Sequence, residues 1–284
     1  MGDLISMNKL TAEERARLDS LCRQFRIDVI ETLHQRQTGH PGGSLSVTEI
    51  LTTLYFEEMD VDPADPQKPD RDRLVLCKGH TAPMLYRVLA EKGFFPVEEM
   101  KTLRCLNSRL QGHPCPLDTP GVDAATGPLG VGLPTALGMA LGLKLDGSKA
   151  RVYAVLGDGE INEGIVWEAL MSAVKFKADN LCAVLDWNGV QLDGPTSEIM
   201  PMGDIPAKFS SFGWHVIECD GHDVEALYEA FEEAKTVKGV PTIVLAHTVK
   251  GKGVSFMEGQ SAWHGKAIDD ASYAQAMKEL GGAC

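Results

Sequence analysis

Apolar residues recur at helical spacing from about residue 11 to residue 36, and Thr11 with Glu14 has the spacing of a capping box at the start of this segment. We expect one long helix whose apolar face packs on the main body. Residues 46–56 predict a second helix, whereas residues 61–69 contain three prolines and several aspartates and predict an exposed loop. The apolar face of the first helix consists of Leu18, Leu21, Phe25, Val29 and Leu33.

Short apolar runs alternate with further helical patterns along the rest of the chain. The runs predict strands at residues 74–77, 152–156, 181–185, 214–218 and 242–246. Helical patterns lie between them. One ends near residue 91, and the others cover residues 137–145, 162–176 and 224–234. This alternation predicts an α/β fold with a parallel sheet covered by helices on both faces. Ligands of such sheets bind at the carboxyl ends of the strands.

The length of 284 residues is compatible with one large α/β domain. We therefore expect residues 1–284 to form a single domain with a helical extension over about residues 1–37. Residues 112–133 are rich in Gly and Pro but also contain apolar residues. They predict an ordered binding loop within the domain rather than a linker.

The formal net charge of -13 argues against a nucleic acid partner, because phosphate backbones are bound by clustered Lys and Arg. No apolar run is long enough to span a membrane, and the first residues lack a signal-peptide pattern. We expect a soluble cytoplasmic protein. The seven cysteines are scattered without a Cys-x-x-Cys pair, which predicts reduced thiols.

Asp158 lies between Gly157 and Gly159, directly after an apolar run and before a helical pattern. Glycines and a helix amino terminus suit a diphosphate, but an aspartate there repels an anion unless it holds a divalent cation. Asn188 follows the next apolar run and would reach the same edge of the sheet as a second ligand. The alternatives are an Asp-Gly turn and an Asn that caps a loop.

Gly157-Asp158-Gly159 with Asn188 resembles the metal and diphosphate motif of thiamine diphosphate enzymes. Five further segments resemble successive transketolase signatures in the same order, so the chain resembles the amino-terminal half of a transketolase over nearly its whole length. That resemblance implies the thiamine diphosphate-binding fold, in its diphosphate-binding module. The segments are Thr38-Gly39-His40-Pro41-Gly42, Lys78-Gly79-His80, Gly112-His113-Pro114, Thr126-Gly127-Pro128-Leu129-Gly130 and Trp263-His264-Gly265.

The resemblance implies that Asp158, Asn188 and the backbone carbonyl of Val190 ligate Mg²⁺ or Ca²⁺. It places Gly157 and Gly159 at the cofactor's diphosphate, with His80 and His264 beside it. His40, His113 and His264 are the catalytic candidates, where an imidazole can donate, accept or transfer a proton. For any one of them, a structural role in a loop or core is the alternative. His34, His215, His222 and His247 are expected to be structural.

The resemblance also implies that Gly127 and Leu129 contact the aminopyrimidine ring, with a Pro-Gly turn as the alternative. Glu163 matches a carboxylate that links two active sites in transketolases, although a Glu at a helix start is also stabilised by the helix dipole. We expect the segment around Lys250 to close over the diphosphate. Cys115 stands where many transketolases have an acid after Gly-His-Pro, so we expect the loop of His113, which would recognise sugar hydroxyls, to differ from the family pattern.

The resemblance implies the amino-terminal subunit of a two-subunit transketolase, which transfers a two-carbon ketol unit from a ketose, a sugar phosphate or related anionic sugar, to an aldose. A carboxy-terminal partner subunit would supply the pyrimidine-binding domain, the carboxy-terminal domain and the activating glutamate, and the assembly would be a heterotetramer. The alternatives are the α subunit of a thiamine-dependent 2-oxo-acid dehydrogenase, which the histidine set disfavours, and a noncatalytic relic.

Overall fold

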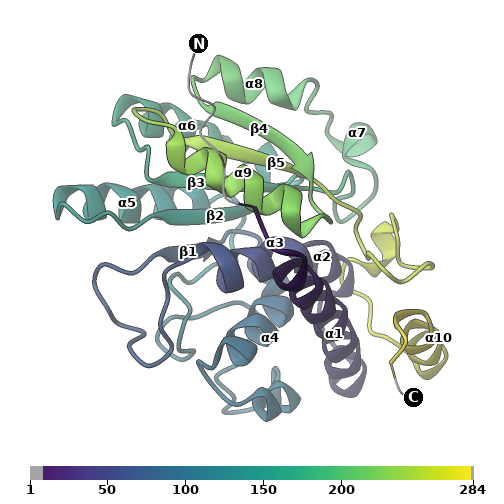
Figure 1. Ribbon diagram of the computed structural model, residues 1–284. Helices are drawn as coiled ribbons and strands as arrows, with labels where there is room; N and C mark the ends of the chain where they lie inside the picture. Colours follow the sequence, from purple (N-terminus) through teal and green to yellow (C-terminus); the bar gives the residue numbers. More distant parts are fainter. Residues whose placement is uncertain (1–8, 283–284) are drawn as a thin grey trace.

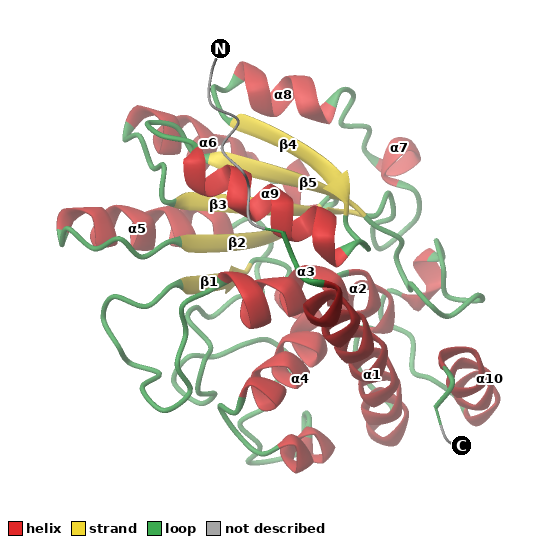
Figure 2. Cartoon of the chain, viewed as in Figure 1, coloured by secondary structure: helices red, strands yellow, loops and turns green. Residues whose placement is uncertain are grey.

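The computed structural model describes residues 9–282 and has a five-stranded parallel sheet at its centre (Figure 1). The strand order is β1-β2-β3-β5-β4, so β5 pairs with β3 although β4 precedes it in sequence. The arrowheads point to one side of the molecule, where the connecting loops gather (Figure 2). The predicted α/β fold is confirmed. The strands are β1 (Arg73–Leu76), β2 (Val152–Gly157), β3 (Leu181–Trp187), β4 (His215–Asp220) and β5 (Thr242–His247).

The central strands are apolar along their length because both faces of the sheet are covered. Val155 and Val184 belong to the hydrophobic core on one face, whereas Ala154 and Leu185 belong to the core on the other. Edge strand β4 differs from the predicted continuous apolar strand: it begins at His215 and is partly exposed. An edge strand has only one neighbour, so fewer of its side chains need to be apolar.

Helices cover both faces of the sheet, as predicted. One core packs α1 (Ala12–Arg36), α3 (Thr48–Thr53), α4 (Ala82–Lys92) and α9 (Val224–Thr236) against the sheet. The other packs α5 (Gly132–Leu145), α6 (Gly164–Lys175) and α8 (Ile205–Ser211). None of the helices within residues 9–282 is both long and apolar enough to cross a membrane.

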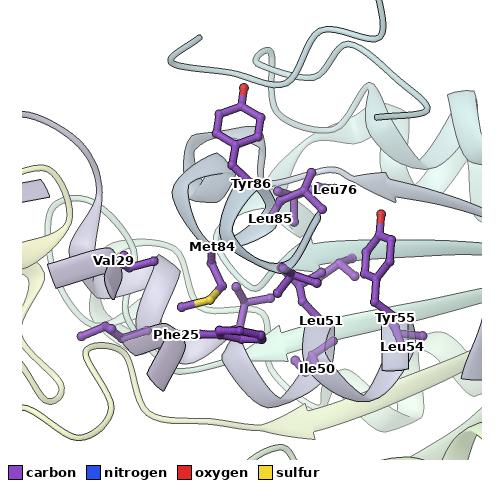
Figure 3. Packing of buried hydrophobic residues seen from close by; sticks show 14 of the residues in the cluster. Phe25, Val29, Ile50, Leu51, Leu54, Tyr55, Leu76, Met84, Leu85 and Tyr86 are labelled. Atoms are coloured by element: carbon purple, nitrogen blue, oxygen red, sulfur yellow. The ribbon is translucent and has the colours of Figure 1, made fainter. Parts of the chain in front are cut away.

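The first helix begins where the sequence predicts, since Thr11 and Glu14 form a capping box at its amino terminus. Its apolar face packs on the main body as expected. Figure 3 shows Phe25 and Val29 of α1 near Met84 of α4 and Ile50 of α3, within one buried cluster. The first eight residues of the predicted extension lie outside the described part of the chain.

The helix predicted over residues 46–56 is wrong in its bounds. The structure instead has α2 (Pro41–Ser46), α3 and a π-helical turn (Leu54–Glu58) in succession. Proline at the first position of α2 starts this segment earlier, because its missing N–H needs no helical partner there. The remaining segments are α7 (Thr196–Ile199), α10 (Asp270–Leu280) and 3-10 turns at Gly79–Thr81, Val97–Thr102, Glu160–Asn162 and Ser261–Trp263.

The sheet order brings together four loops that are distant in sequence. Strands β1, β2, β3 and β5 are consecutive neighbours, and each points its carboxyl end to the same edge. The loops after them carry Lys78, Asp158, Asn188 and Lys250 respectively. A site at this edge therefore receives one polar side chain from each of four adjacent strands.

Candidate active site

A pocket of about 250 Å³ lies at the carboxyl edge of the sheet. It collects most of the predicted site residues: all but His40 and Glu163 line it. Lys250, for which the sequence predicts no definite role, also lines the pocket. Five further lining residues were not predicted as site residues, namely Gly43, Lys78, Glu160, Gln191 and Leu192. The predicted residues that line the pocket are His80, His113, Gly127, Leu129, Gly157, Asp158, Gly159, Asn188, Val190 and His264.

Asp158 is a buried carboxylate, 3% exposed, and within residues 9–282 it accepts hydrogen bonds only from backbone amides. Gly159 N donates to Oδ1 at 2.9 Å, and Gly189 N donates to Oδ2. Burial, and after it the negative charge of Asp186, raises the pKa of Asp158 to about 6. A buried carboxylate held by two amides, without a paired cation among residues 9–282, suits a divalent metal ion.

Asn188 and Val190 follow β3 and face the same pocket. The Asn188 side-chain oxygen accepts a hydrogen bond from Val190 N at 3.2 Å. The Val190 carbonyl accepts one from the ammonium group of Lys250 at 2.9 Å. This carbonyl oxygen therefore already contacts a positive charge, and a backbone carbonyl that can accept from a cation can also ligate a metal ion.

Within residues 9–282, no group of three or more His, Cys, Asp or Glu side chains is arranged to hold a metal. The oxygen donors at this site are instead a carboxylate, an amide and a backbone carbonyl. That mixed set fits Mg²⁺, which commonly takes few protein ligands and completes its shell with phosphate and water.

Lys250 is 2% exposed, and its ammonium also lies 3.0 Å from His264 Nδ1. Burial, followed by the charge of Lys78, lowers the pKa of Lys250 to about 8. Below that pH the ammonium is a cation buried beside the Val190 carbonyl. The predicted closing segment therefore contributes a charged side chain to the pocket.

Lys78, which lines the pocket, forms a buried ion pair with Asp186. Ser46 Oγ donates to the same carboxylate at 2.6 Å, and Thr248 Oγ1 donates to its other oxygen. Although burial opposes ionisation, Lys78 and these donors lower the pKa of Asp186. The ion pair connects the loop after β1 to β3, and the Thr248 bond connects β3 to the segment that carries Lys250.

His40, His80 and His264 form a ring cluster at one side of the pocket, with ring centroids 4.9 to 5.5 Å apart. Burial lowers the pKa of His40 to about 4 and that of His264 to about 3. The pKa of His80 also lies well below its usual value because the ring is buried near Lys78. These imidazoles are neutral at pH 7, so each can both donate and accept a hydrogen bond.

The four histidines expected to be structural differ from His40, His80, His113 and His264. Each places a ring nitrogen 2.8 to 3.0 Å from a carboxylate. The site histidines have no such partner within residues 9–282. The two sets of histidines therefore differ in their hydrogen-bond partners. The carboxylate pairs are His34 with Asp270, His215 with Glu233, His222 with Glu49 and His247 with Glu218.

Arg104 joins the two predicted substrate-facing loops, a role that the sequence did not reveal. Its Nη1 donates to Thr38 Oγ1 at 2.8 Å, and its Nη2 lies 3.4 Å from the Gly112 carbonyl. After burial, its charge is the largest cause that lowers the pKa of both His40 and His113. Arg104 adopts a left-handed φ of 56°. This conformation costs free energy in a non-glycine residue.

Glu160 links the loop that begins at Gly157 to the loop of Gly127 and Leu129. Its carboxylate accepts from Gly130 N at 2.8 Å and from Gly157 N at 3.1 Å. Gly130 has a φ of 85°, and a Cβ there would lie 2.7 Å from Glu163 Cβ. Burial raises the pKa of Glu160 to about 7. The position of Glu160 directly after the Gly-Asp-Gly motif was the only sequence signal for it.

Two predicted residues lie outside the pocket lining. His40 contacts it through the rings of His80 and His264. Glu163 is exposed at the amino-terminal cap of α6, beside Gly130. Three buried side-chain atoms around the site lack a hydrogen-bond partner in the described structure, which favours a polar ligand here. They are His40 Nδ1, Thr126 Oγ1 and Gln191 Nε2.

The fold and the site define a thiamine diphosphate-binding module of an α/β enzyme. The chain belongs to the transketolase family, since the family model described as the transketolase thiamine diphosphate binding domain matches residues 18–283. The resemblance recognised in the sequence is confirmed, and the chain corresponds to the thiamine diphosphate-binding part of a transketolase.

Relatives of two kinds match the chain. The 6-deoxy-6-sulfo-D-fructose transketolase subunit SqwG of Clostridium sp. strain MSTE9 is 42% identical, over 95% of this chain and 98% of that protein. One of the subunits of the apulose-4-phosphate transketolase of Phocaeicola vulgatus is 38% identical, over 89% of each chain. The solved transketolase of Pichia stipitis in complex with sedoheptulose-7-phosphate superposes with a TM-score of 0.89 at 32% identity. That match covers 93% of this chain and 41% of the Pichia chain.

Proposed function

We propose that this chain is the cofactor-anchoring subunit of a two-subunit transketolase that moves a two-carbon ketol unit from an anionic ketose to an aldose. The observation that carries the proposal is one pocket that combines Asp158, Asn188, Lys250 and neutral imidazoles at the carboxyl edge of the sheet. Thiamine diphosphate, when bound, supplies the electron sink for breaking and making the carbon-carbon bond. The remaining tasks fall to protein side chains.

Asp158, Asn188 and the Val190 carbonyl would hold Mg²⁺, or Ca²⁺ in its place, against the cofactor's diphosphate. Gly157 and Gly159 would let the backbone approach the phosphate oxygens. The ammonium of Lys250 is the local positive charge that a diphosphate needs in a chain with a net charge of -13. Lys250 is therefore assigned to the diphosphate here, a role that the sequence left open.

His80 and His264 would donate to the diphosphate or lie beside it. His40, His113 and His264 would face the reacting carbons of the sugar, where neutral imidazoles can hold hydroxyl groups and transfer a proton between oxygens. Their lowered pKa values support this, because a permanently protonated ring could not accept.

Gly127 and Leu129 would contact the cofactor's ring. Leu129 and Leu192 line the pocket and are 39% and 60% exposed, so its mouth is partly apolar. An exposed apolar rim around a polar pocket suits a second protein that closes it. Glu163, exposed at the start of α6, would then meet the neighbouring site through that interface.

The second protein would be a subunit with the pyrimidine-binding domain, the carboxy-terminal domain and the activating glutamate. The similarity to relatives named as transketolase subunits, nearly end to end in the case of SqwG, supports this arrangement. In this proposal residues 1–284 form a single diphosphate-binding domain, and two copies of each of the two chains form a heterotetramer. The free thiols of the described cysteines support a reducing compartment such as the cytoplasm.

The test is a substrate comparison on the assembly of this chain with its partner, in thiamine diphosphate and Mg²⁺. Pentose phosphates, a branched sugar phosphate, a sulfonated ketose and pyruvate are offered as donors. We expect ketol transfer from an anionic ketose and no decarboxylation of pyruvate. Decarboxylation of pyruvate without ketol transfer would contradict the proposal and favour a 2-oxo-acid dehydrogenase.

A further inference from the structure

A buried chain of hydrogen bonds runs from the first helix to the segment that carries Lys250. Arg26 donates to both carboxylate oxygens of Glu49 at 2.6 Å. Glu49 Oε2 lies 2.8 Å from His222 Nδ1, and His222 Nε2 accepts from Val249 N at 2.8 Å. Arg26 and Glu49 are 7% and 5% exposed. This series of hydrogen bonds therefore connects α1 and α3 to the backbone immediately before Lys250.

The two bonds of His222 fix its tautomer. A backbone N–H can only donate, so Nε2 must carry the lone pair that accepts from Val249. The ring proton then lies on Nδ1 and is donated to Glu49. Although burial opposes it, Arg26 and then His222 lower the pKa of Glu49, so this carboxylate is an ionised acceptor. His222 is thus oriented by a charged group and presents its acceptor to Val249.

The Val249 bond is one of several that seat this segment. Thr248 Oγ1 donates to Asp186, and Gly251 N donates to the Gly42 carbonyl at 2.9 Å. Between these anchors, the Lys250 side chain reaches the Val190 carbonyl at 2.9 Å. A backbone shift at Val249 would displace the Lys250 ammonium directly, because the two residues are adjacent.

We propose that His222 is a positioning residue that seats Lys250 against the cofactor's diphosphate through the Val249 amide. This inference rests on the proposed function, because Lys250 acts on the diphosphate only if the pocket binds thiamine diphosphate. Mutating a residue that orients a metal ligand commonly lowers metal affinity or activity by about 10- to 100-fold, and we expect a loss of similar size for a residue that orients Lys250. A residue that served only to satisfy Glu49 would not affect Lys250, since Arg26 already binds both oxygens of that carboxylate.

Two substitutions separate these roles. His222→Gln can place an amide oxygen near the position of Nε2 and still accept from Val249. His222→Asn can place an amide N–H near the position of Nδ1 and still donate to Glu49, but it cannot reach Val249. His215→Gln and His215→Asn are matched controls, because His215 pairs with Glu233 near the surface and does not line the pocket.

Hydrogen exchange of a peptide that contains Val249 is measured on the full chain. Thiamine diphosphate affinity is measured by calorimetry with Mg²⁺ on the chain assembled with its partner. We expect His222→Asn to speed exchange at Val249 and weaken cofactor binding about 10-fold or more, and His222→Gln to remain within about 3-fold of wild type. Unchanged exchange and affinity in His222→Asn, or equal losses in both variants, would overturn the proposal.

The two hypotheses fail differently. If wild type binds cofactor and His222→Asn binds it equally well, the positioning role is wrong and the proposed function stands. If wild type itself binds no thiamine diphosphate, the proposed function is contradicted and the positioning role with it. Thermal unfolding of all variants shows whether a loss of affinity merely follows a loss of folded protein.

Discussion

The ammonium group of Lys250 lies 2.9 Å from the carbonyl oxygen of Val190, although the two residues follow different strands. They meet because β5 pairs directly with β3, as Leu185 does with Leu245. The protein therefore provides its own positive charge at the carbonyl that is proposed to ligate the metal.

Replacing Lys250 with Met removes the charge and keeps most of the side-chain volume. We expect thiamine diphosphate affinity to fall about 10- to 100-fold, because a charge-assisted contact to phosphate is lost. Lys252→Met is the matched control, since Lys252 lies outside the pocket lining. Calorimetry with Mg²⁺ measures both. Equal affinity for the two variants would contradict the assignment of Lys250.

Replacing Asp158 with Asn should change how stability depends on pH. The folded pKa of about 6 exceeds the usual 3.8, so the wild-type carboxyl favours folding at low pH and loses that contribution as pH rises through 6. Between about pH 4 and pH 8, the metal-free variant should gain about 2–3 kcal/mol relative to wild type. Denaturant unfolding at both pH values in chelator measures this difference.

The same substitution should abolish Mg²⁺-dependent binding of the cofactor, because the carboxylate ligand of the metal is gone. A variant that is more stable at about pH 8 and yet binds no cofactor would identify Asp158 as a functional charge. A pH-independent difference in unfolding free energy would show that the carboxyl titrates normally.

Glu160→Ala leaves the amides of Gly130 and Gly157 without an acceptor in a buried position. Unsatisfied buried groups cost about 1–3 kcal/mol each, so we expect a loss of about 2–4 kcal/mol in the free energy of unfolding. Glu160→Gln retains one accepting oxygen and should lose about half as much. Glu163→Ala, at an exposed position on the same turn, should change stability by less than about 0.5 kcal/mol. Equal effects of the three substitutions would refute the bridging role.

Arg104→Met should damage sugar recognition more than cofactor binding. Without the guanidinium, the pKa of His40 and of His113 should rise, so the acid limb of the rate profile should move to higher pH. We expect kcat/KM to fall about 10-fold with an unchanged cofactor Kd. Arg109→Met, which removes the partly exposed pair with Glu99 and the contact of the guanidinium with the Phe95 ring, is the control, because Arg109 does not line the pocket. An unshifted pH profile would argue against Arg104 as the link between the histidines.

The sequence alone predicted the fold class well because its strands are short, apolar and regularly separated by helical patterns. Asp158 and Asn188 could be paired for the same reason, since successive parallel strands place their ends at one edge. The loop motifs that resemble transketolase signatures then identified four histidines as candidate site residues. The sequence misled at residues 46–56, where an early helix start at Pro41 and a π-helical turn replaced a single helix, and at edge strand β4, which is less apolar than predicted.

The residues that the sequence could not reveal act through tertiary contacts. Arg104 donates a hydrogen bond to Thr38, which is distant in sequence, and no local sequence pattern predicts such a bond. Lys250 reaches Val190 only because β5, rather than β4, is the neighbour of β3. The role of His222 depends on Glu49 and Val249, which approach it from two other segments. Strand order and side-chain burial were the missing information in each case.

The central claim is that this chain holds the diphosphate end of the cofactor and depends on a partner for turnover. The most direct measurement is the rate of ketol transfer by the isolated chain and by the chain reconstituted with its pyrimidine-binding partner, both with thiamine diphosphate and Mg²⁺. We expect transfer only after reconstitution, and its loss when Asn188→Ala is used. Substantial transfer by the isolated chain, or an active reconstituted Asn188→Ala assembly, would contradict the account.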